Sequence, residues 1–138
     1  MNQEKMRRLP DTEFEIMMIV WESAPPITTA VIMEKLGTAR GWKAPTAISF
    51  LLRLVAHGFL RTEKPERERL YYPLVAEDDY LRFETERFVR TYHANSSVSF
   101  FNALIESHDL SPEELDELQS LIATTKKRCS RPSKGGTP

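Results

Sequence analysis

Apolar residues in the first third of the chain recur at helical spacing and stop at proline or glycine. Phe14, Met17, Met18 and Trp21 share one face of a helix, and Ala24-Pro25-Pro26 ends it. Thr12 and Glu15 have the spacing of a capping box, which predicts that this helix begins at Thr12. A second, short helix is expected with Thr29 as its N-cap and Gly37 after its end.

The segment from Trp42 to Val75 combines a helical stretch with two stretches typical of strands. Pro45 can open a helix because its missing N–H would be unpaired there anyway, and Gly58 can close it in a left-handed conformation. Residues 61–75 then read as a β-hairpin around a polar tip. The residues of this helix expected to face the core are Ala47, Phe50, Leu51 and Leu54. Three helices followed by a hairpin predict a winged helix, which usually places its third helix in a DNA groove.

Three further helices are expected in the back half of the chain. One spans Glu77 to about Tyr92, a second follows the break at 93–97, and a third begins at Ser111, where serine precedes proline and glutamate. Residues 127–138 are basic and rich in glycine and proline, so a disordered tail is expected. The predicted fold class is mainly α with a small β-hairpin. It comprises a winged helix-turn-helix domain in 1–75 and a C-terminal helical dimerisation domain in 76–126.

The three back-half helices are short and amphipathic, and units of this size usually need oligomerisation to be stable. A homodimer is therefore expected, and the alternative is a monomer in which these helices fold back on the winged helix. The residues expected at the dimer interface are Leu81, Phe88, Phe101, Leu104, Leu115, Leu118 and Ile122.

The outward face of the third helix carries two apolar residues, Ile48 and Leu52, among polar ones. These can contact thymine methyl groups while Thr46 and Ser49 hydrogen-bond to bases or phosphates, although packing against another part of the protein is the alternative. Basic residues around the helix and the hairpin are candidate phosphate contacts. The full set of expected DNA-binding residues is Lys43, Pro45, Thr46, Ile48, Ser49, Leu52, Arg53, Arg67 and Arg69.

Charge and composition change this picture little. Net charge is −1, but residues 1–75 hold 11 Lys and Arg against 9 Asp and Glu, whereas residues 76–138 hold 8 against 11. A mildly basic front half and an acidic back half suit a DNA-binding domain joined to an interaction domain, although ordinary surface scatter also accounts for the difference. No apolar run approaches the roughly 20 residues that span a bilayer, and a single cysteine, Cys129, indicates a reducing cytoplasm.

The order and spacing of several short segments resemble the penicillinase-repressor (BlaI/MecI) family of transcription regulators, over about residues 8–126. The matching positions are Leu9, 13–21, Trp42, Thr46, 51–54 with Arg53, 58–60, 71–75 and 109–115. The resemblance implies a dimer with two N-terminal winged helices, which represses from pseudo-palindromic promoter sites. It also implies a partner that relieves repression, such as the membrane sensor protease that signals cleavage in antibiotic-responsive members.

The chain departs from that family pattern at two places, and it also lacks a feature of the copper-responsive relatives. Ile48 stands where the family commonly has arginine, which puts the usual operator in doubt. The cleaved Asn-Phe bond of the antibiotic-responsive members would fall at Ala103-Leu104, so proteolysis triggered by β-lactams is not supported. Cys129 cannot by itself form the cysteine cluster of copper-responsive relatives.

The pattern favours a DNA-binding transcriptional repressor that acts as a homodimer on a pseudo-palindromic operator. The alternative is a winged helix used only for protein contacts. An enzyme is disfavoured because the chain has no phosphate loop or nucleophile motif, and no histidine has a metal-binding spacing. No cofactor, metal or catalytic residue is therefore predicted.

Overall fold

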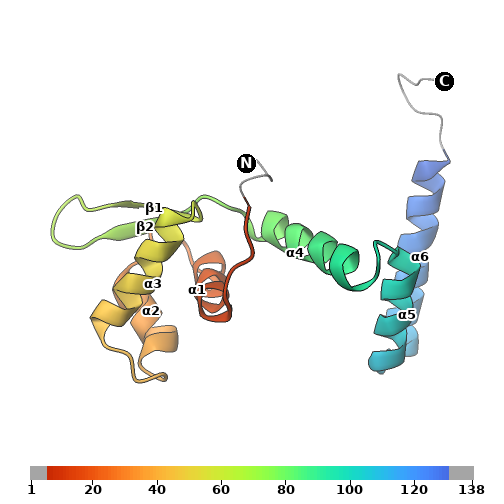
Figure 1. Ribbon diagram of the computed structural model, residues 1–138, viewed down its shortest axis with the longest axis horizontal. Coiled ribbons are helices and arrows are strands. Elements are labelled where there is room, and N and C mark those ends of the chain that lie inside the picture. Colours follow the sequence, from red (N-terminus) through yellow and green to blue (C-terminus); the bar gives the residue numbers. More distant parts are fainter. Residues whose placement is uncertain (1–5, 131–138) are drawn as a thin grey trace, which may run out of the picture. The chain divides into compact units, whose positions relative to one another are not determined.

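A computed structural model describes residues 6–130 of the chain. Figure 1 shows its elements in order: α1 (Asp11–Glu22), α2 (Thr29–Ile32), the π-helical turn η2 (Met33–Gly37), α3 (Ala44–Ala56), β1 (Leu60–Glu63), β2 (Leu70–Pro73), α4 (Glu77–Tyr92), α5 (Ser97–Ser107) and α6 (Pro112–Cys129). The chain divides into two compact units, Met1–Phe88 and Val89–Pro138. The predicted class, mainly α with one hairpin, is confirmed.

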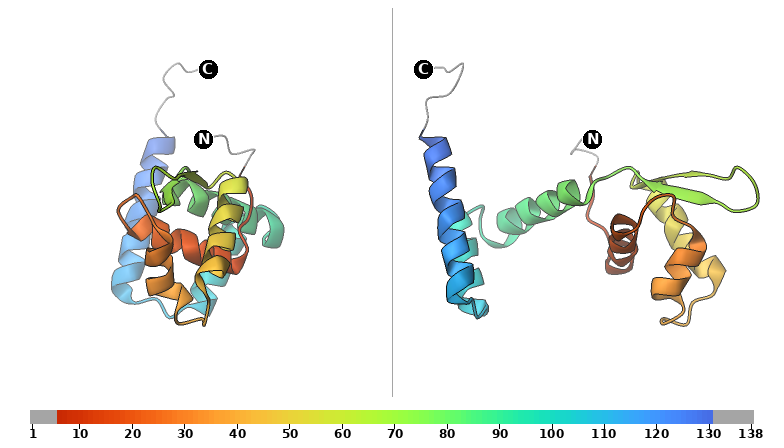
Figure 2. Two further views of the ribbon diagram at one scale, coloured as in Figure 1. Left: turned by 90° about the vertical axis from the view of Figure 1, so that its left-hand side faces the viewer. Right: turned by 180° about the vertical axis from the view of Figure 1, so that it is seen from behind.

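The first unit is a winged helix. Strands β1 and β2 pair in antiparallel register from Leu60 opposite Pro73 to Glu63 opposite Leu70. Ile27, between α1 and α2, extends this ribbon through two backbone hydrogen bonds of 2.8 and 2.9 Å with Tyr71. Helices α1, α2 and α3 lie together beside the hairpin in the views of Figures 1 and 2.

The core of this unit contains the face of α3 that the apolar spacing predicted. Ala47, Leu51 and Leu54 are fully buried among residues of α1, the hairpin and α4. Phe50 differs, because it is only half-buried and stacks on Trp42 with ring centroids 5.0 Å apart. The expected inward face is therefore confirmed at three of its four positions, and the fourth packs at the edge of the core.

Two helix starts differ from the sequence-based expectation. Helix α1 begins at Asp11, and Pro10 is its N-cap, without a side-chain cap. The Pro10 carbonyl accepts a 2.9 Å hydrogen bond from the Phe14 amide, so the first helical bond forms before Thr12 can serve as the cap. Helix α2 is capped by Thr28 rather than Thr29, through a 3.4 Å bond that Thr28 Oγ1 accepts from the Val31 amide.

Helix α4 begins as part of the first unit. Its Tyr80 is only 1% exposed and contacts the rings of Phe14, Trp21 and Phe59. Trp21 Nε1 also donates a 2.9 Å hydrogen bond to the carbonyl of Val75, directly before α4. The compact units accordingly divide within α4, after Phe88, rather than at the expected boundary after residue 75.

The second unit contains α5 and α6, and none of the residues of these two helices is buried. The capping box expected at the start of α6 is present: Ser111 Oγ accepts from the Glu114 amide, and the Glu114 carboxylate accepts from the Ser111 amide. Helix α6 continues to Cys129, so residues 127–129 are helical rather than part of the expected tail. Ser130 is the C-cap of α6, and residues 131–138 of that expected tail lie outside the described residues.

Candidate nucleic-acid interface

Helix α3 presents one continuous exposed face opposite its buried one. Pro45 occupies the first turn, and Lys43 in extended conformation is the N-cap. Ile48 is 36% exposed and Leu52 is 42% exposed, although both are large apolar residues. All seven residues of this region expected to bind DNA are exposed: Lys43, Pro45, Thr46, Ile48, Ser49, Leu52 and Arg53. Among the described residues of the first unit, none buries this face, so the alternative that Ile48 and Leu52 pack against the winged helix itself does not hold.

An ion pair joins the loop before α3 to α1. Arg40 Nη2 donates to both carboxylate oxygens of Glu15 at 2.6 Å, and Trp42 stacks on Phe50. These contacts fix the position at which α3 begins, and hence the direction of its exposed face. Sequence reasoning did not pair Arg40 with Glu15, because the two residues are 25 positions apart and no local pattern relates them.

Arg53 has two neighbours within the winged helix, an aromatic ring and a carboxylate. Its guanidinium lies 5.2 Å from the centre of the Phe50 ring, and its Nη1 is 3.9 Å from Glu13 Oε2. His57, the C-cap of α3, places Nδ1 3.7 Å from Glu13 Oε1. Sequence reasoning missed Glu13, although its spacing to the buried residues Ile16, Met17 and Val20 places it on the inward face of α1.

The hairpin contributes fewer free cations than its sequence indicates. Arg61 lies 4.0 Å from the centre of the Tyr72 ring and pairs with Glu63 at 2.9 Å. Arg69 is half-buried, with Nη1 3.5 Å from Thr62 Oγ1, whereas Arg67 is exposed in the tip. Of the two hairpin residues expected to contact phosphates, Arg67 is therefore the more accessible.

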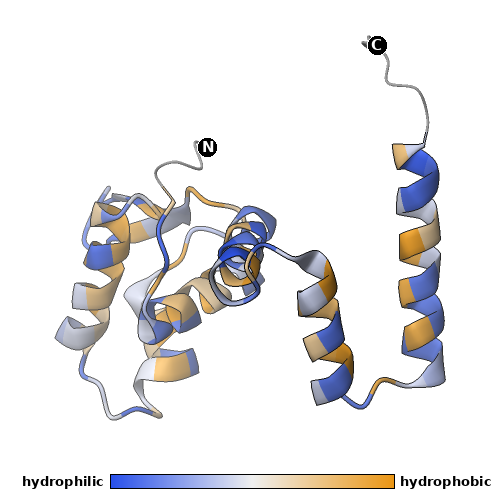
Figure 3. Ribbon diagram, turned by 45° about the vertical axis from the view of Figure 1, so that its right-hand side comes forward, coloured by the Kyte–Doolittle hydropathy of each residue, from blue (hydrophilic) through white to orange (hydrophobic). Residues whose placement is uncertain are grey.

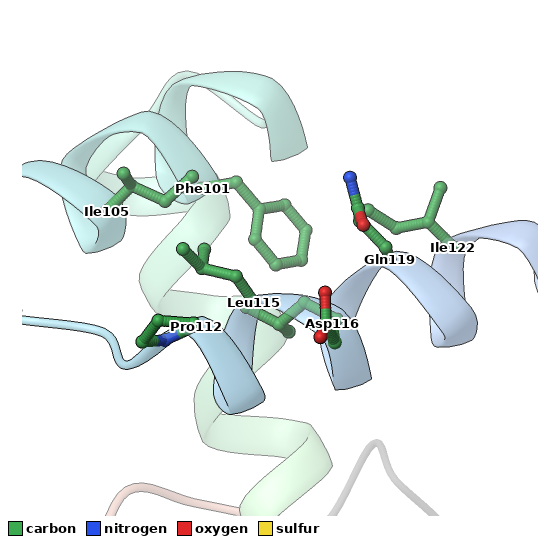
Figure 4. A pocket seen from close by; sticks show the side chains of 8 residues that line it. Phe101, Ile105, Pro112, Leu115, Asp116, Gln119 and Ile122 are labelled. Carbon is green, nitrogen blue, oxygen red and sulfur yellow. The ribbon is translucent and has the colours of Figure 1, made fainter.

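The second unit carries an apolar pocket between α5 and α6 with a volume of about 420 Å³ (Figure 4). Its lining residues are Phe101, Ile105, Pro112, Leu115, Asp116, Leu118, Gln119 and Ile122. Figure 3 shows the hydrophobic segments along these two helices in orange. Four residues expected at a dimer interface, Phe101, Leu115, Leu118 and Ile122, are thus brought together.

The other three residues expected at the dimer interface lie elsewhere. Leu104 is half-buried on α5 and does not line the pocket. Leu81 and Phe88 are exposed on the part of α4 that belongs to the first unit. Ile105, which the dimer set omitted, lines the pocket, and its spacing of four residues from Phe101 could have indicated this.

Within residues 6–130, no three histidine, cysteine or acidic side chains are grouped as metal ligands, and Cys129 is an exposed free thiol. The same residues include no helix that is both long and apolar enough to cross a membrane.

Comparisons with known proteins give a consistent result. The penicillinase repressor family model matches residues 9–124. The chain is 28% identical to the penicillinase repressor of Bacillus licheniformis over 125 residues, covering 91% of this chain and 97% of that one. It is 25% identical to the methicillin resistance regulatory protein MecI of Staphylococcus aureus (strain N315), covering 86% and 95%.

Among solved structures, the DNA-binding domain of the repressor BlaI is similar, at 32% identity and a TM-score of 0.46, with 53% of this chain and 88% of that one covered. A Bacillus licheniformis BlaI monomer in complex with the blaP half-operator matches at 31% identity and a TM-score of 0.45, with 54% and 89% covered. Because the family model spans most of the chain, from the start of the winged helix into α6, the chain belongs to the penicillinase repressor family.

Proposed function

We propose that this protein is a transcriptional repressor that binds an inverted-repeat operator as a homodimer in the cytoplasm. The observation that carries the proposal is the exposed face of α3, where apolar and polar side chains lie side by side on a helix whose opposite face buries Ala47, Leu51 and Leu54 in the core. Such a face can read base edges in the major groove through methyl contacts and hydrogen bonds together. Membership of the penicillinase repressor family supports repression rather than protein contacts alone.

Within this proposal, Thr46, Ile48, Ser49 and Leu52 face the bases, and Pro45 sets the approach of the helix. Lys43, Arg53, Arg67 and Arg69 contact phosphates, which position the protein and supply much of the affinity. A second copy of the chain covers the pocket between α5 and α6, and this pairing supplies the two-fold symmetry that an inverted repeat requires.

A sensor or protease that relieves repression is a further partner in this proposal. The residues at Ala103-Leu104 do not match the cleaved bond of antibiotic-responsive relatives, so proteolysis triggered by β-lactams at that bond is not supported. These two residues lie inside helix α5, where an intact helix also protects the backbone from a protease.

A gel shift with the chain's own upstream DNA, repeated across salt concentrations, tests the proposal. Four phosphate contacts per protomer predict a slope of log K against log salt of about −7 for a dimer. Half-sites should lie on one face of the duplex, roughly one or two helical turns apart. Arg53→Ala should weaken binding to all sequences and flatten the slope by about 2, one contact being lost per protomer.

The control is a duplex in which one half-site is scrambled. Binding that is equal on the scrambled and intact sites, or binding that does not depend on salt, would contradict operator recognition.

A further inference from the structure

Glu13 is a buried carboxylate beside the DNA-binding helix. Its side chain is 3% exposed, whereas Arg53 is 57% and His57 is 29% exposed. The two closest charged or titratable partners lie at 3.9 Å (Arg53) and 3.7 Å (His57), both longer than a hydrogen bond. Among the described residues, neither Glu13 Oε1 nor His57 Nδ1 has a hydrogen-bond partner.

A carboxylate removed from water at this depth is costly unless charges or donors compensate it. Glu13 lies in the first turn of α1, where the helix dipole favours a negative charge, and this covers part of the cost. Arg53 on α3 and His57 at its C-cap offset the rest of this cost, since each lies within 4 Å of a different oxygen of the carboxylate. One carboxylate is therefore shared between two neighbours and is bound tightly by neither.

We infer that Glu13 competes with DNA phosphates for Arg53, an inference that rests on the proposed DNA binding. In the free protein the carboxylate attracts the guanidinium from the core side, while more than half of the Arg53 side chain faces solvent, from which a phosphate can approach. When the guanidinium turns to the phosphate, Glu13 loses one of its two neighbours. His57 then becomes the remaining partner of the carboxylate. Its Nδ1 is 3.7 Å from Glu13 Oε1, and a shift of less than about 1 Å brings the two atoms to N–H···O hydrogen-bond distance.

This arrangement gives Glu13 and His57 opposite effects on DNA affinity. Glu13 weakens binding because each complex must first separate Arg53 from it. His57 strengthens binding because it satisfies the carboxylate that Arg53 leaves behind. Both effects act through Arg53, so both should disappear when Arg53 is absent.

The experiment measures operator affinity for single and double variants of the full chain, with thermal melts alongside. Glu13→Gln keeps the shape and removes the charge, and it should tighten binding about two- to fivefold, the range of an ion pair screened by solvent on the Arg53 side. His57→Phe keeps a ring and removes both nitrogens, and it should weaken binding by a similar factor. In an Arg53→Ala background, each change should alter affinity by less than about 1.5-fold.

Glu15→Gln is the matched control, since it removes the same charge from the same helix but its partner is Arg40. Its effect should be the same with and without Arg53. A Glu13→Gln effect that persists unchanged in the Arg53→Ala background would show a general charge effect and overturn the inference. Lower thermal stability with unchanged affinity would show a purely structural role and overturn it as well.

Failure of the proposed function is distinguishable from failure of this inference. A chain that binds no operator at all refutes DNA binding, whereas a chain that binds and responds equally to Glu13→Gln and Glu15→Gln refutes only the competition. Should His57→Phe fail to fold, the cycle of Glu13→Gln with Arg53→Ala decides by itself.

Discussion

At the scale of single residues, Ile48 is the position where the sequence is expected to depart from the family pattern, in which arginine is common. An arginine at this position could donate hydrogen bonds to guanine or phosphate, whereas isoleucine offers only apolar contact. The structure places Ile48 on the exposed face of α3, next to polar neighbours and away from the core. The difference therefore concerns what the protein contacts rather than how it folds.

Replacing Ile48 should change base preference and leave the fold intact. Ile48→Arg is expected to shift the preferred base at one position in each half-site. Ile48→Ala should relax that preference at a cost of about 1 kcal/mol or less, the scale of a lost methyl contact. Binding-site selection on the three proteins measures this. Identical preferences would show that Ile48 does not read DNA, and a marked drop in melting temperature would show that it supports the fold instead.

At the scale of elements, α4 is the helix that links the two units, and its first half is held in the winged helix by one buried side chain. Tyr80 Oη accepts a 2.8 Å hydrogen bond from the Leu9 amide and donates one of 2.7 Å to Glu84. The ring lies in an aromatic cluster with Phe14, Trp21 and Phe59. Packing and the Leu9 hydrogen bond thus fix helix α4 to the rest of the winged helix, whereas the Glu84 bond lies within α4 itself.

Tyr80→Phe keeps the ring and removes both hydrogen bonds. It should lower the free energy of unfolding by about 1–3 kcal/mol, because the buried Leu9 amide is left without its acceptor. Tyr92→Phe is the matched control on the same helix, and since Tyr92 is exposed, a smaller change is expected. Urea unfolding of both variants measures the difference. An equal effect of the two substitutions would show that the Tyr80 hydroxyl does not stabilise the attachment of α4 to the winged helix.

The same hydroxyl predicts an alkaline loss of stability. Burial raises the pKa of Tyr80 well above its ordinary value of 10.0, because the phenolate is disfavoured away from water. The unfolded chain therefore loses this proton first, so the contribution of Tyr80 is full below about pH 10 and declines as pH rises above it. Unfolding at pH 8 and pH 11 should show a shallower decline in Tyr80→Phe than in the parent chain.

At the scale of the whole molecule, the division after Phe88 predicts which fragment folds. A fragment 1–88 retains Tyr80 and should fold as a monomer, whereas a fragment 1–75 lacks this core side chain and should be markedly less stable.

The full chain should sediment as a dimer, and Phe101→Asp in the apolar pocket should dissociate it. Analytical ultracentrifugation and melting curves measure both. A monomeric full chain at micromolar concentration, or a dimeric 1–88 fragment, would contradict dimerisation through α5 and α6.

What the sequence determined by itself is the set of elements and their faces. Helical spacing, proline at helix starts and the capping box at Ser111 act over four or five residues, so they can be read without knowledge of the rest of the chain. The same local reasoning placed Ala47, Leu51 and Leu54 inward and Ile48 outward, as the structure confirms.

Only the tertiary structure decided which distant residues meet. Glu13 and Arg53 are 40 positions apart and Leu9 and Tyr80 are 71 apart, and no local pattern relates either pair. The extent of the first unit was decided in the same way, because Tyr80 belongs to the core only once the aromatic side chains of α1 surround it. Periodicity states which face of a helix is buried, whereas the partner on that face depends on how the elements pack against one another.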